Sequence, residues 1–391
     1  MTNKAESATI GSCIIVGGGL AGIQVARGLQ KLKGKGGKGG ITVTVVDRQN
    51  YLDWSLASPR SVVAPDDVQK FGYVMPLTSV CEFVGADFVQ GAVDKIGPKS
   101  VTLEDGTTLE ADYVVVAIGG QYASGAIWKP TPDQTTMEER IVAFRALNKK
   151  IADAKSIVVA GAGPTGVEVA GEIKAAFPDT TVTMVGTLLH SSPEALQTRM
   201  KGVLEKMGVV VQEGRVDVEA PDADGNVKTR DGVFIKADLV LNAAGFIFAG
   251  AKLADQTLAK DLTARGQFNC RPTLQLQGCD TVYCCGDVLA VPEGCFADVK
   301  GSSHADSTAD IVAANIILQL QGKESSPALK EFAWSKTPIN KPFMTALGPK
   351  IAVGYIGMPH FLENFMARSI KCKDYYMSLK GKGYGKGKTW K

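Results

Sequence analysis

The sequence predicts an α/β protein, and three observations lead to this prediction. A short apolar strand, Cys13–Val16, runs into glycines with G-x-G-x-x-G spacing and then into a helical pattern. The same arrangement returns in SIVVAGAGPTGVEVAGEI. Each copy is followed by an antiparallel-looking stretch and a closing apolar strand, ADYVVVAIG or ADLVLNAAG. We therefore expect an internal repeat of two units, each with a parallel sheet.

The first copy carries the marks of a dinucleotide-binding turn. Gly17 allows the tight turn, Gly19 lets the backbone approach a pyrophosphate, and Gly22 lets helix and strand pack closely. The second strand, ITVTVVD, ends in Asp47, whose carboxylate could accept hydrogen bonds from ribose hydroxyls. The alternative is that the glycines only make a tight turn between strand and helix.

The second copy repeats the spacing with Gly161, Gly163 and Gly166. Its second strand ends at Val185–Gly186, without an acid for a ribose 2′-hydroxyl and without an arginine nearby for a 2′-phosphate. A ribose with a 2′-hydroxyl and one with a 2′-phosphate therefore both stay open for the ligand of this unit. Two such units in one chain predict two dinucleotides, one of which passes electrons to the other.

The rest of the chain completes the domain prediction. TVYCCGDV ends a further strand at Gly286–Asp287, and DSTADIVAANIILQL has a helical pattern. FLENFMARSIKCKDYYM predicts an amphipathic helix near the C-terminus. We expect two Rossmann-like dinucleotide-binding domains and a C-terminal α+β segment, with these bounds: 1–130 together with 255–325 for the first domain, 131–254 for the second, and 326–391 for the C-terminal segment.

Composition excludes several classes of protein. The 391 residues exceed what one hydrophobic core usually holds, roughly 250–300 residues. The 45% hydrophobic and 21% charged residues are typical of a globular chain and not of a disordered one. No apolar run reaches the roughly 18 residues of a membrane-spanning helix. MTNKAESATIG shows no secretory signal and no myristoylation glycine, so neither secretion nor N-myristoylation is expected.

The cysteine and histidine counts and the charge distribution bear on disulfides, metal sites and binding partners. Eight cysteines without a CxxC form no disulfide framework, which favours a reducing compartment, and with three histidines we expect no metal site. The net charge is +3, yet residues 371–391 hold seven lysines against Asp374. The body is therefore mildly acidic, and nucleic-acid binding is not expected. The basic tail is either solvated or a contact for an anionic membrane surface.

These motifs resemble the flavoproteins with two dinucleotide-binding domains. The match is closer to the apoptosis-inducing-factor-like group and the ferroptosis suppressor protein family, through VVDRQNYLDW, GAGPTGVEVAGEI, CCGD and IKCKDYYM. The chain is similar also to type II NADH dehydrogenases. The resemblance implies FAD in the first unit and NADH and/or NADPH in the second. It implies FAD contacts from Gly17, Gly19, Gly22, Asp47, Arg60 and Asp287, and NAD(P)H contacts from Gly161, Gly163, Gly166 and Glu168.

The resemblance also implies three catalytic residues. Glu168 would orient groups or handle protons near the nicotinamide, whereas an acid there could also only stabilise the helix dipole. Lys371 matches the quinone-site lysine and Tyr376 a pocket aromatic; the alternative for Lys371 is a solvated tail lysine. Asp287 would bond the FAD ribitol, the alternative being a helix N-cap.

The implied function is an NAD(P)H:quinone oxidoreductase, cytoplasmic or peripheral on an organelle or lipid surface. The alternative is a redox-sensing interaction protein whose nicotinamide-reduced flavin controls partner binding, and a small protein acceptor is a third possibility. Disulfide reductases need a cysteine pair early in the chain, and no cysteine lies between Cys13 and Cys81. Sulfide:quinone reductases need redox cysteines beside the flavin, and none lies between Cys81 and Cys270.

Overall fold

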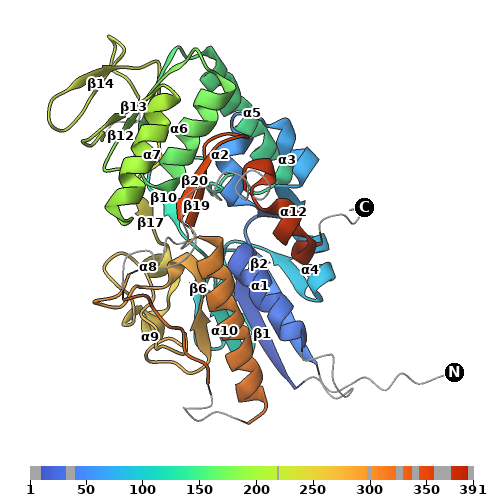
Figure 1. The fold of residues 1–391 in the computed structure, drawn as a ribbon. Coiled ribbons are helices and arrows are strands. Elements are labelled where there is room, and N and C mark those ends of the chain that lie inside the picture. The colour runs from blue at the N-terminus through green and yellow to red at the C-terminus, as the bar shows by residue number, and fades with distance from the viewer. Residues whose placement is uncertain are drawn as a thin grey trace.

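Two α/β units and a small C-terminal segment make up the fold (Figure 1). The computed structural model describes residues 10–31, 40–217, 220–296, 301–322, 329–336, 343–355 and 371–385. In Figure 1 the green elements of the second unit lie in the upper half and β1, α1 and α10 in the lower half. The red elements β19, β20 and α12 lie between the two.

The first unit is built on a five-stranded parallel sheet in the order β18-β9-β1-β2-β5. Its central strands are almost continuously apolar because both faces of a parallel sheet are covered. The first strand begins two residues earlier than predicted. The strands are β1 (Gly11–Val16), β2 (Ile41–Asp47), β5 (Asp87–Gln90), β9 (Tyr113–Val116) and β18 (Val282–Cys284).

Two helices of this unit pack along each other, α1 (Leu20–Leu29) and α10 (Ser302–Leu320). A Cβ on Gly28 would lie 2.6 Å from the Cβ of Ala313, so the glycine allows the close approach. The predicted helix after residue 305 is confirmed, and it begins earlier, at Ser302. A third helix, α4 (Leu77–Val84), contacts α1.

The second unit has a four-stranded parallel sheet in the order β13-β12-β11-β16. Its long helix α5 begins with a capping box, in which Thr136 and Glu139 satisfy each other's backbone N–H groups. The elements are β11 (Ser156–Ala160), β12 (Thr181–Val185), β13 (Val209–Gln212), β16 (Leu239–Asn242), α5 (Met137–Asp153), α6 (Pro164–Ala176) and α7 (Glu194–Lys206).

Matching hydrogen bonds confirm the internal repeat. At the amino end of the first sheet, the backbone N–H and hydroxyl of Ser12 donate to Asp112 at 2.8 and 2.9 Å. In the second sheet, Ser156 donates to Asp238 in the same way at 2.8 and 3.0 Å. In each unit the serine lies at the start of the first strand, as its second residue in β1 and its first in β11, and the aspartate precedes the closing strand. The same junction is therefore built twice.

Antiparallel stretches follow each copy, as predicted. In the first unit the turn contains Gly106, at φ +87°, where a left-handed backbone favours glycine. The two units also meet in a short antiparallel pair, in which Tyr122 lies opposite Phe246. The strands are β6 (Val93–Ile96), β7 (Ser100–Leu103), β8 (Thr108–Glu110), β14 (Asn226–Lys228), β15 (Phe234–Lys236), β10 (Gln121–Tyr122) and β17 (Phe246–Ile247).

Short elements cover the edges of the units. The boundary expected at residue 254, between the second domain and the return to the first, stays a prediction. Helix α8, which precedes this boundary, contacts β6 of the first unit. The short elements are β3 (Tyr51–Asp53), β4 (Val74–Pro76), α2 (Ser58–Ser61), α3 (Asp66–Phe71), α8 (Gly250–Leu253) and α9 (Gln256–Ala259), with 3-10 turns η2 (Ser55–Ala57) and η3 (Gly286–Val288).

The C-terminal part combines a hairpin and short helices, which confirms its α+β character. The hairpin contacts α6, and residues 371–385 dock on the first unit, where the indole N–H of Trp54 donates to the carbonyl of Tyr375 at 2.8 Å. The predicted apolar residues at 361–370 lie outside the described residues. The elements are β19 (Phe343–Ala346), β20 (Ala352–Tyr355), α12 (Met377–Lys380) and η6 (Gly381–Tyr384). Within the described ranges, no helix is both long and apolar enough to cross a bilayer.

Candidate functional site

A cleft of about 370 Å³ lies at the carboxyl ends of the first sheet, and we call it the central cleft. Ligands of open α/β sheets bind at these ends. The start of α6 and residues of the C-terminal part complete its walls. Lining residues with polar or aromatic side chains include Asp47, Tyr51, Asp53, Tyr122, Trp128, Lys129, Thr165, Glu168, Phe246, Asp287, Lys371 and Tyr376.

A larger hollow, of about 790 Å³, lies at the opposite end of the first sheet. It is lined by Ile10, Asp112 and Thr281, which directly precede β1, β9 and β18. The loops there belong to the amino ends of the strands. None of the predicted site residues lines this hollow, so we place the chemistry in the central cleft.

The first glycine turn has the geometry of a phosphate cradle. Gly17 has φ +111°, and a Cβ there would lie 2.5 Å from the carbonyl oxygen of Ala117. A Cβ on Gly22 would lie 1.9 Å from the oxygen of Gly17, so only glycine lets α1 approach the turn. Around Gly19, in contrast, no atom lies within 4 Å of such a Cβ. This open space at the N-terminus of α1 fits a pyrophosphate.

Asp47 braces the same turn. Its carboxylate accepts from the backbone N–H groups of Gly18, at 2.6 Å, and of Gln49, at 2.9 Å. Burial raises the pKa of Asp47, although these two donors oppose the shift. The residue lines the central cleft at the end of β2, where a ribose would follow the pyrophosphate.

The second glycine turn repeats this geometry. Gly161 has φ +117°, and a Cβ on Gly166 would lie 1.9 Å from the oxygen of Gly161. No atom lies within 4 Å of a Cβ on Gly163. Gly186 directly follows β12 at φ +149°, and a Cβ there would lie 2.8 Å from the backbone nitrogen of Ala162. The second unit therefore has the phosphate cradle without an acid at the end of β12.

Glu168 and Lys371 form an ion pair inside the central cleft. The carboxylate lies 2.5 Å from the Lys371 ammonium, which also donates to the carbonyl of Met344 at 2.5 Å. Both side chains are about nine-tenths buried. Lys371 is therefore not a solvated tail lysine. Glu168 also accepts from the backbone N–H of Ala346, at 3.3 Å, so it does more than stabilise a helix dipole.

Burial and neighbouring charges shift the pKa values of Glu168 and Lys371. Burial raises the pKa of Glu168, and the Lys371 ammonium only partly offsets this. Burial alone would lower the pKa of Lys371, but Glu168 and Tyr376 outweigh it, so the pKa of Lys371 is raised. The Tyr376 ring centre lies 5.7 Å from the Lys371 ammonium. The structure thus brings the three expected catalytic residues to one cleft.

Asp287 also lines the central cleft, within η3. The N-cap of η3 is Cys285 and that of α10 is Gly301, so Asp287 caps neither helix. Its carboxylate lies 3.8 Å from the ammonium of Lys129. The position fits the expected contact to a ribitol.

Arg60 differs from the expectation of a FAD contact. Its side chain is buried and does not line the central cleft. The guanidinium donates twice to Glu172 of α6, at 2.7 and 2.8 Å, and once to the carbonyl of Cys372 at 3.3 Å. A carboxylate within reach on α6 holds the arginine behind the wall of the cleft. The structure thus places Arg60 outside the lining of the central cleft, and its contact with FAD stays a prediction.

Sequence reasoning missed several residues of the cleft. Lys129 was not recognised because it lies in the irregular stretch after the first closing strand. Tyr122 donates its hydroxyl to Thr165 at 3.1 Å, and its ring meets that of Phe246 edge to face at 5.2 Å. Aligning the repeats could have found these two aromatics, since each follows a closing strand, in AIGGQY and AAGF.

Cysteines and metal-binding groups contribute little to the described cleft. One cysteine, Cys285, lies among the described lining residues, and burial raises the pKa of its thiol. Two cysteines would be needed for a disulfide, so the described lining offers no redox pair. Across the described ranges, no three His, Cys, Asp or Glu side chains are grouped to hold a metal ion.

Comparisons with known proteins agree with this geometry. Apoptosis-inducing factor homolog B of Dictyostelium discoideum is 26% identical over 392 residues, which cover 93% of this chain and 94% of the relative. Ferroptosis suppressor protein 1 of Xenopus tropicalis is 25% identical and covers 95% of each chain. The crystal structure of a ferredoxin reductase from Rhodopseudomonas palustris, 18% identical, covers 93% of this chain and 95% of its own, with a TM-score of 0.62.

The family match covers both cradles. Residues 11–307 match the pyridine nucleotide-disulphide oxidoreductase family, and this range includes both glycine turns. The match implies that the chain binds FAD and NAD(P)H, as the resemblance to apoptosis-inducing-factor-like proteins predicts. The first cradle with Asp47 fits FAD, and the second cradle fits the nicotinamide dinucleotide. The chain belongs to the pyridine nucleotide-disulphide oxidoreductase family.

Proposed function

We propose that this protein is an NAD(P)H:quinone oxidoreductase. The observation that carries the proposal is the buried ion pair of Glu168 and Lys371 on the wall of the central cleft. FAD, when bound, accepts two electrons from NAD(P)H and passes them to an acceptor. Overall, NAD(P)H, one proton and a quinone give NAD(P)⁺ and the quinol.

The residues of the cleft suit this reaction. Negative charge develops on the quinone oxygens during reduction, and the Lys371 ammonium can stabilise it and supply a proton from Nζ. Glu168 keeps Lys371 charged and holds it in place. The Tyr376 ring and the Met344 side of β19 add partly apolar surface beside the ammonium. Beside Tyr376 the lining thus combines the Lys371 ammonium with an aromatic ring, which suits a quinone ring.

Two half-reactions separate this function from its alternative. The FAD-loaded protein is mixed anaerobically with NADH or NADPH while flavin absorbance is followed, and ubiquinone-1 is added afterwards. We expect bleaching by the nicotinamide and reoxidation by the quinone over many turnovers. A stable long-wavelength band that quinone barely discharges would instead support the redox-sensing interaction protein.

Variants test the role of Lys371. Lys371→Met should lower the rate of quinone reduction about 100-fold, the typical size of general acid catalysis, and leave bleaching by NADH nearly unchanged. Lys373→Met, two residues away and exposed, is the matched control and should behave like the wild type. Equal quinone turnover in both variants would remove Lys371 from the reaction.

The pH dependence of quinone reduction gives a second test of the role of Lys371. Because Glu168 helps to raise the pKa of Lys371, the ammonium persists at neutral pH, and deprotonation of Lys371 should slow the quinone step in the alkaline range. In Glu168→Gln the ammonium loses this partner. The alkaline decline should then move to lower pH, which stopped-flow traces at a series of pH values would show.

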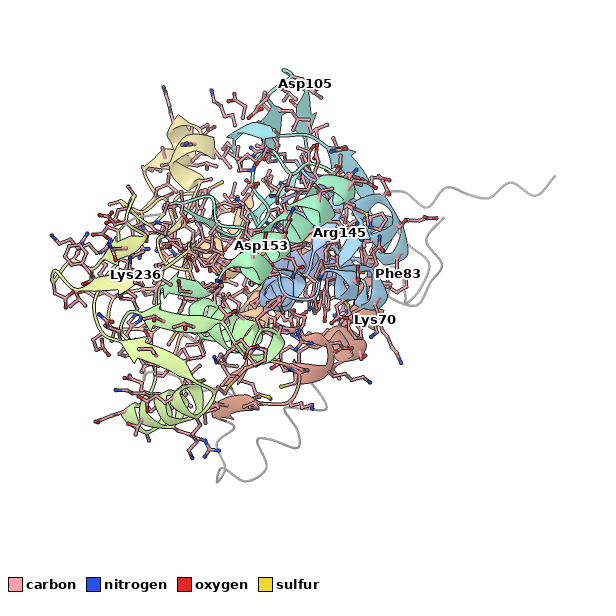
Figure 2. All side chains as sticks on the ribbon, turned by 90° about the horizontal axis from the view of Figure 1, so that it is seen from above. Lys70, Phe83, Asp105, Arg145, Asp153 and Lys236 are labelled. Atoms are coloured by element: carbon pink, nitrogen blue, oxygen red, sulfur yellow. The ribbon has the colours of Figure 1, made fainter. Side chains whose placement is uncertain are left out.

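A membrane contact beside the C-terminal segment remains part of the proposal. Leu379 and Phe83 are 66% and 37% exposed, and η6, next to Leu379, contacts α4, which carries Phe83. Figure 2 shows Phe83 and Lys70 at the edge of the molecule where the C-terminal helix lies. Lys373 and Lys382 are also exposed. Apolar side chains among lysines suit an anionic bilayer.

Flotation with phosphatidylserine vesicles tests this contact. The wild type should float with anionic vesicles at low salt and not with neutral ones. Leu379→Asp should reduce flotation severalfold, while Val142→Asp, at the exposed Val142 of α5, serves as the control. Flotation that ignores lipid charge, or equal flotation of both variants, would contradict the proposed surface.

A further inference from the structure

Arg60, Glu172 and Tyr375 form a buried cluster where α2, α6 and the C-terminal segment meet. Glu172 accepts both hydrogen bonds of the Arg60 fork and a third from the Tyr375 hydroxyl, at 2.8 Å. Arg60 also donates to the carbonyl of Cys372. One carboxylate thus joins the first unit, the second unit and the segment that carries Lys371 and Tyr376.

The cluster is withdrawn from solvent. Arg60, Glu172 and Tyr375 are 5%, 1% and 0% exposed. Burial raises the pKa of Tyr375, so its phenol stays a donor at neutral pH. A charge pair buried to this degree is tolerated only with well-aligned hydrogen bonds, and removing one partner leaves the other charge uncompensated. Each of the two charges therefore depends on the other.

The C-terminal segment takes an unfavourable backbone conformation at this point. Tyr375 and Tyr376 have φ +50° and +67°, in the left-handed region that non-glycine residues avoid. Such residues persist where surrounding contacts over-determine them. Here Trp54 binds the Tyr375 carbonyl and Glu172 its hydroxyl. The left-handed turn places Tyr376 at the cleft, whereas Tyr375 points into the cluster.

The cluster and the cleft share one helix. Glu168 and Glu172 lie one turn apart on α6, and the first meets Lys371 while the second meets Arg60 and Tyr375. Lys371 and Cys372 are adjacent, so the hydrogen bond from Arg60 to Cys372 fixes the backbone beside the lysine. A shift of the segment against α6 would change the distance between Lys371 and Glu168.

We propose that Arg60, Glu172 and Tyr375 are positioning residues that hold the segment 371–376 so that Lys371 and Tyr376 face the central cleft. This inference rests on the proposed function for its kinetic effect. Its structural effect, the docking of the segment, can be measured without any acceptor.

The test uses three variants of the FAD-loaded protein. Tyr375→Phe removes one hydrogen bond and keeps the charge pair, whereas Glu172→Gln removes the carboxylate. Tyr384→Phe is the matched control, since Tyr384 is buried in the same segment against the Trp54 ring. Hydrogen exchange of the 371–376 amides, flavin bleaching by NADH, and the kcat and KM for quinone are measured for each.

We expect the two variants to lose quinone reduction but to keep flavin reduction by NADH. Tyr375→Phe should lower quinone kcat about tenfold and Glu172→Gln about 100-fold, the cost of misplacing a reacting group by about 1 Å. Bleaching by NADH should stay within about twofold, since the cofactor cradles are not touched. Exchange of the 371–376 amides should rise at least about tenfold over that of Tyr384→Phe. If Glu172→Gln does not fold, Tyr375→Phe alone decides.

The pH profile adds a readout that loosening alone would not produce. Glu172 contributes to the raised pKa of Glu168. At acidic pH, protonation of Glu168 would break its ion pair with Lys371 and slow the quinone step, and in Glu172→Gln this decline should move to lower pH. The groups that interact electrostatically with Glu168 are Lys371 and Glu172, with Cys372, Tyr375, Tyr376 and Tyr122.

The outcomes separate this inference from the proposed function. If the wild type bleaches with NADH but never reduces quinone, the proposed function fails, and hydrogen exchange still decides whether the cluster holds the segment. If the wild type reduces quinone and Tyr375→Phe and Glu172→Gln match it in kcat, the positioning role is overturned. Faster exchange with unchanged quinone kinetics also overturns it, because the cluster would then only stabilise the segment.

Discussion

The two units share one glycine turn and differ in what surrounds it. In each, the first glycine has a left-handed φ, the third lies under the turn, and the middle one faces open space. Gln24 and Glu168 both stand two residues after the third glycine, on α1 and α6. Gln24 donates to Asp310 of α10 at 2.7 Å, whereas Glu168 meets Lys371 in the cleft.

One turn further along, the difference repeats. Gly28 of α1 lies tight against Ala313 of α10, and its counterpart on α6 is Glu172, which meets Arg60 and Tyr375. Helix α1 is covered by α10, another helix of its own unit. Helix α6 is covered by the C-terminal part and by the first unit. The repeat thus keeps its phosphate turns and diverges on the helix face that the rest of the chain covers.

The largest effect on stability is expected where a new side chain would enter one of the two glycine turns. A Cβ on Gly22 or Gly166 would lie 1.9 Å from a carbonyl oxygen, so Gly22→Ala and Gly166→Ala should each lower the free energy of unfolding by about 2 kcal/mol or more. Gly22→Ala should also lose FAD and its yellow colour. Gly166→Ala should stay yellow and resist bleaching by NADH.

Urea unfolding and flavin absorbance measure both effects. The control is Gly202→Ala in α7, where no atom lies within 4 Å of the new Cβ and the helix gains up to about 1 kcal/mol. Loss of FAD from Gly166→Ala with retention in Gly22→Ala would reverse the assignment of the two units.

The middle glycines should affect ligands more than stability. Gly19→Ala and Gly163→Ala place a methyl group in space free of protein atoms, so the free energy of unfolding of the apoprotein should change by less than about 1 kcal/mol. The methyl would instead meet phosphate, and we expect roughly tenfold weaker FAD or NAD(P)H binding, respectively. Titration of each variant with each cofactor measures this, and equal weakening of both cofactors by one variant would contradict it.

An acid introduced at the end of β12 should create a cofactor preference that the second unit does not encode there. Gly186 cannot carry a side chain without meeting Ala162, but Thr187, next to it, is exposed. Thr187→Asp should raise the KM for NADPH about tenfold, about 1.4 kcal/mol, by repelling the 2′-phosphate, and leave that for NADH within twofold. Thr187→Asn is the uncharged control. Equal changes for both nicotinamides would show that the adenosine ribose lies elsewhere.

The smallest effect concerns the diverged helix face. Gln24→Glu introduces a second carboxylate beside Asp310, so at pH 7 the free energy of unfolding should fall by about 1 kcal/mol. The two carboxylates repel each other only when both are ionised, so the loss should be present at neutral pH and vanish at low pH. Thermal unfolding at a series of pH values measures this, and adding Asp310→Asn should restore the stability.

Much of the fold could be predicted because its signals are local. Parallel strands buried on both faces are apolar runs, and a strand–helix turn around a phosphate needs glycine at fixed spacing. The repeat was visible for the same reason. The ion pair of Arg60 could not be predicted, because no local pattern shows that a carboxylate on α6 lies within reach of its guanidinium.

By itself, the sequence determined the two α/β units, their phosphate turns and the acid that only the first unit has, because each depends on residues within a few positions of one another. Only the tertiary structure decided that Lys371 is a buried partner of Glu168 and that Glu172 joins Arg60 to Tyr375. These residues lie far apart in the chain. Burial and the pairing of opposite charges, which no spacing encodes, bring them together.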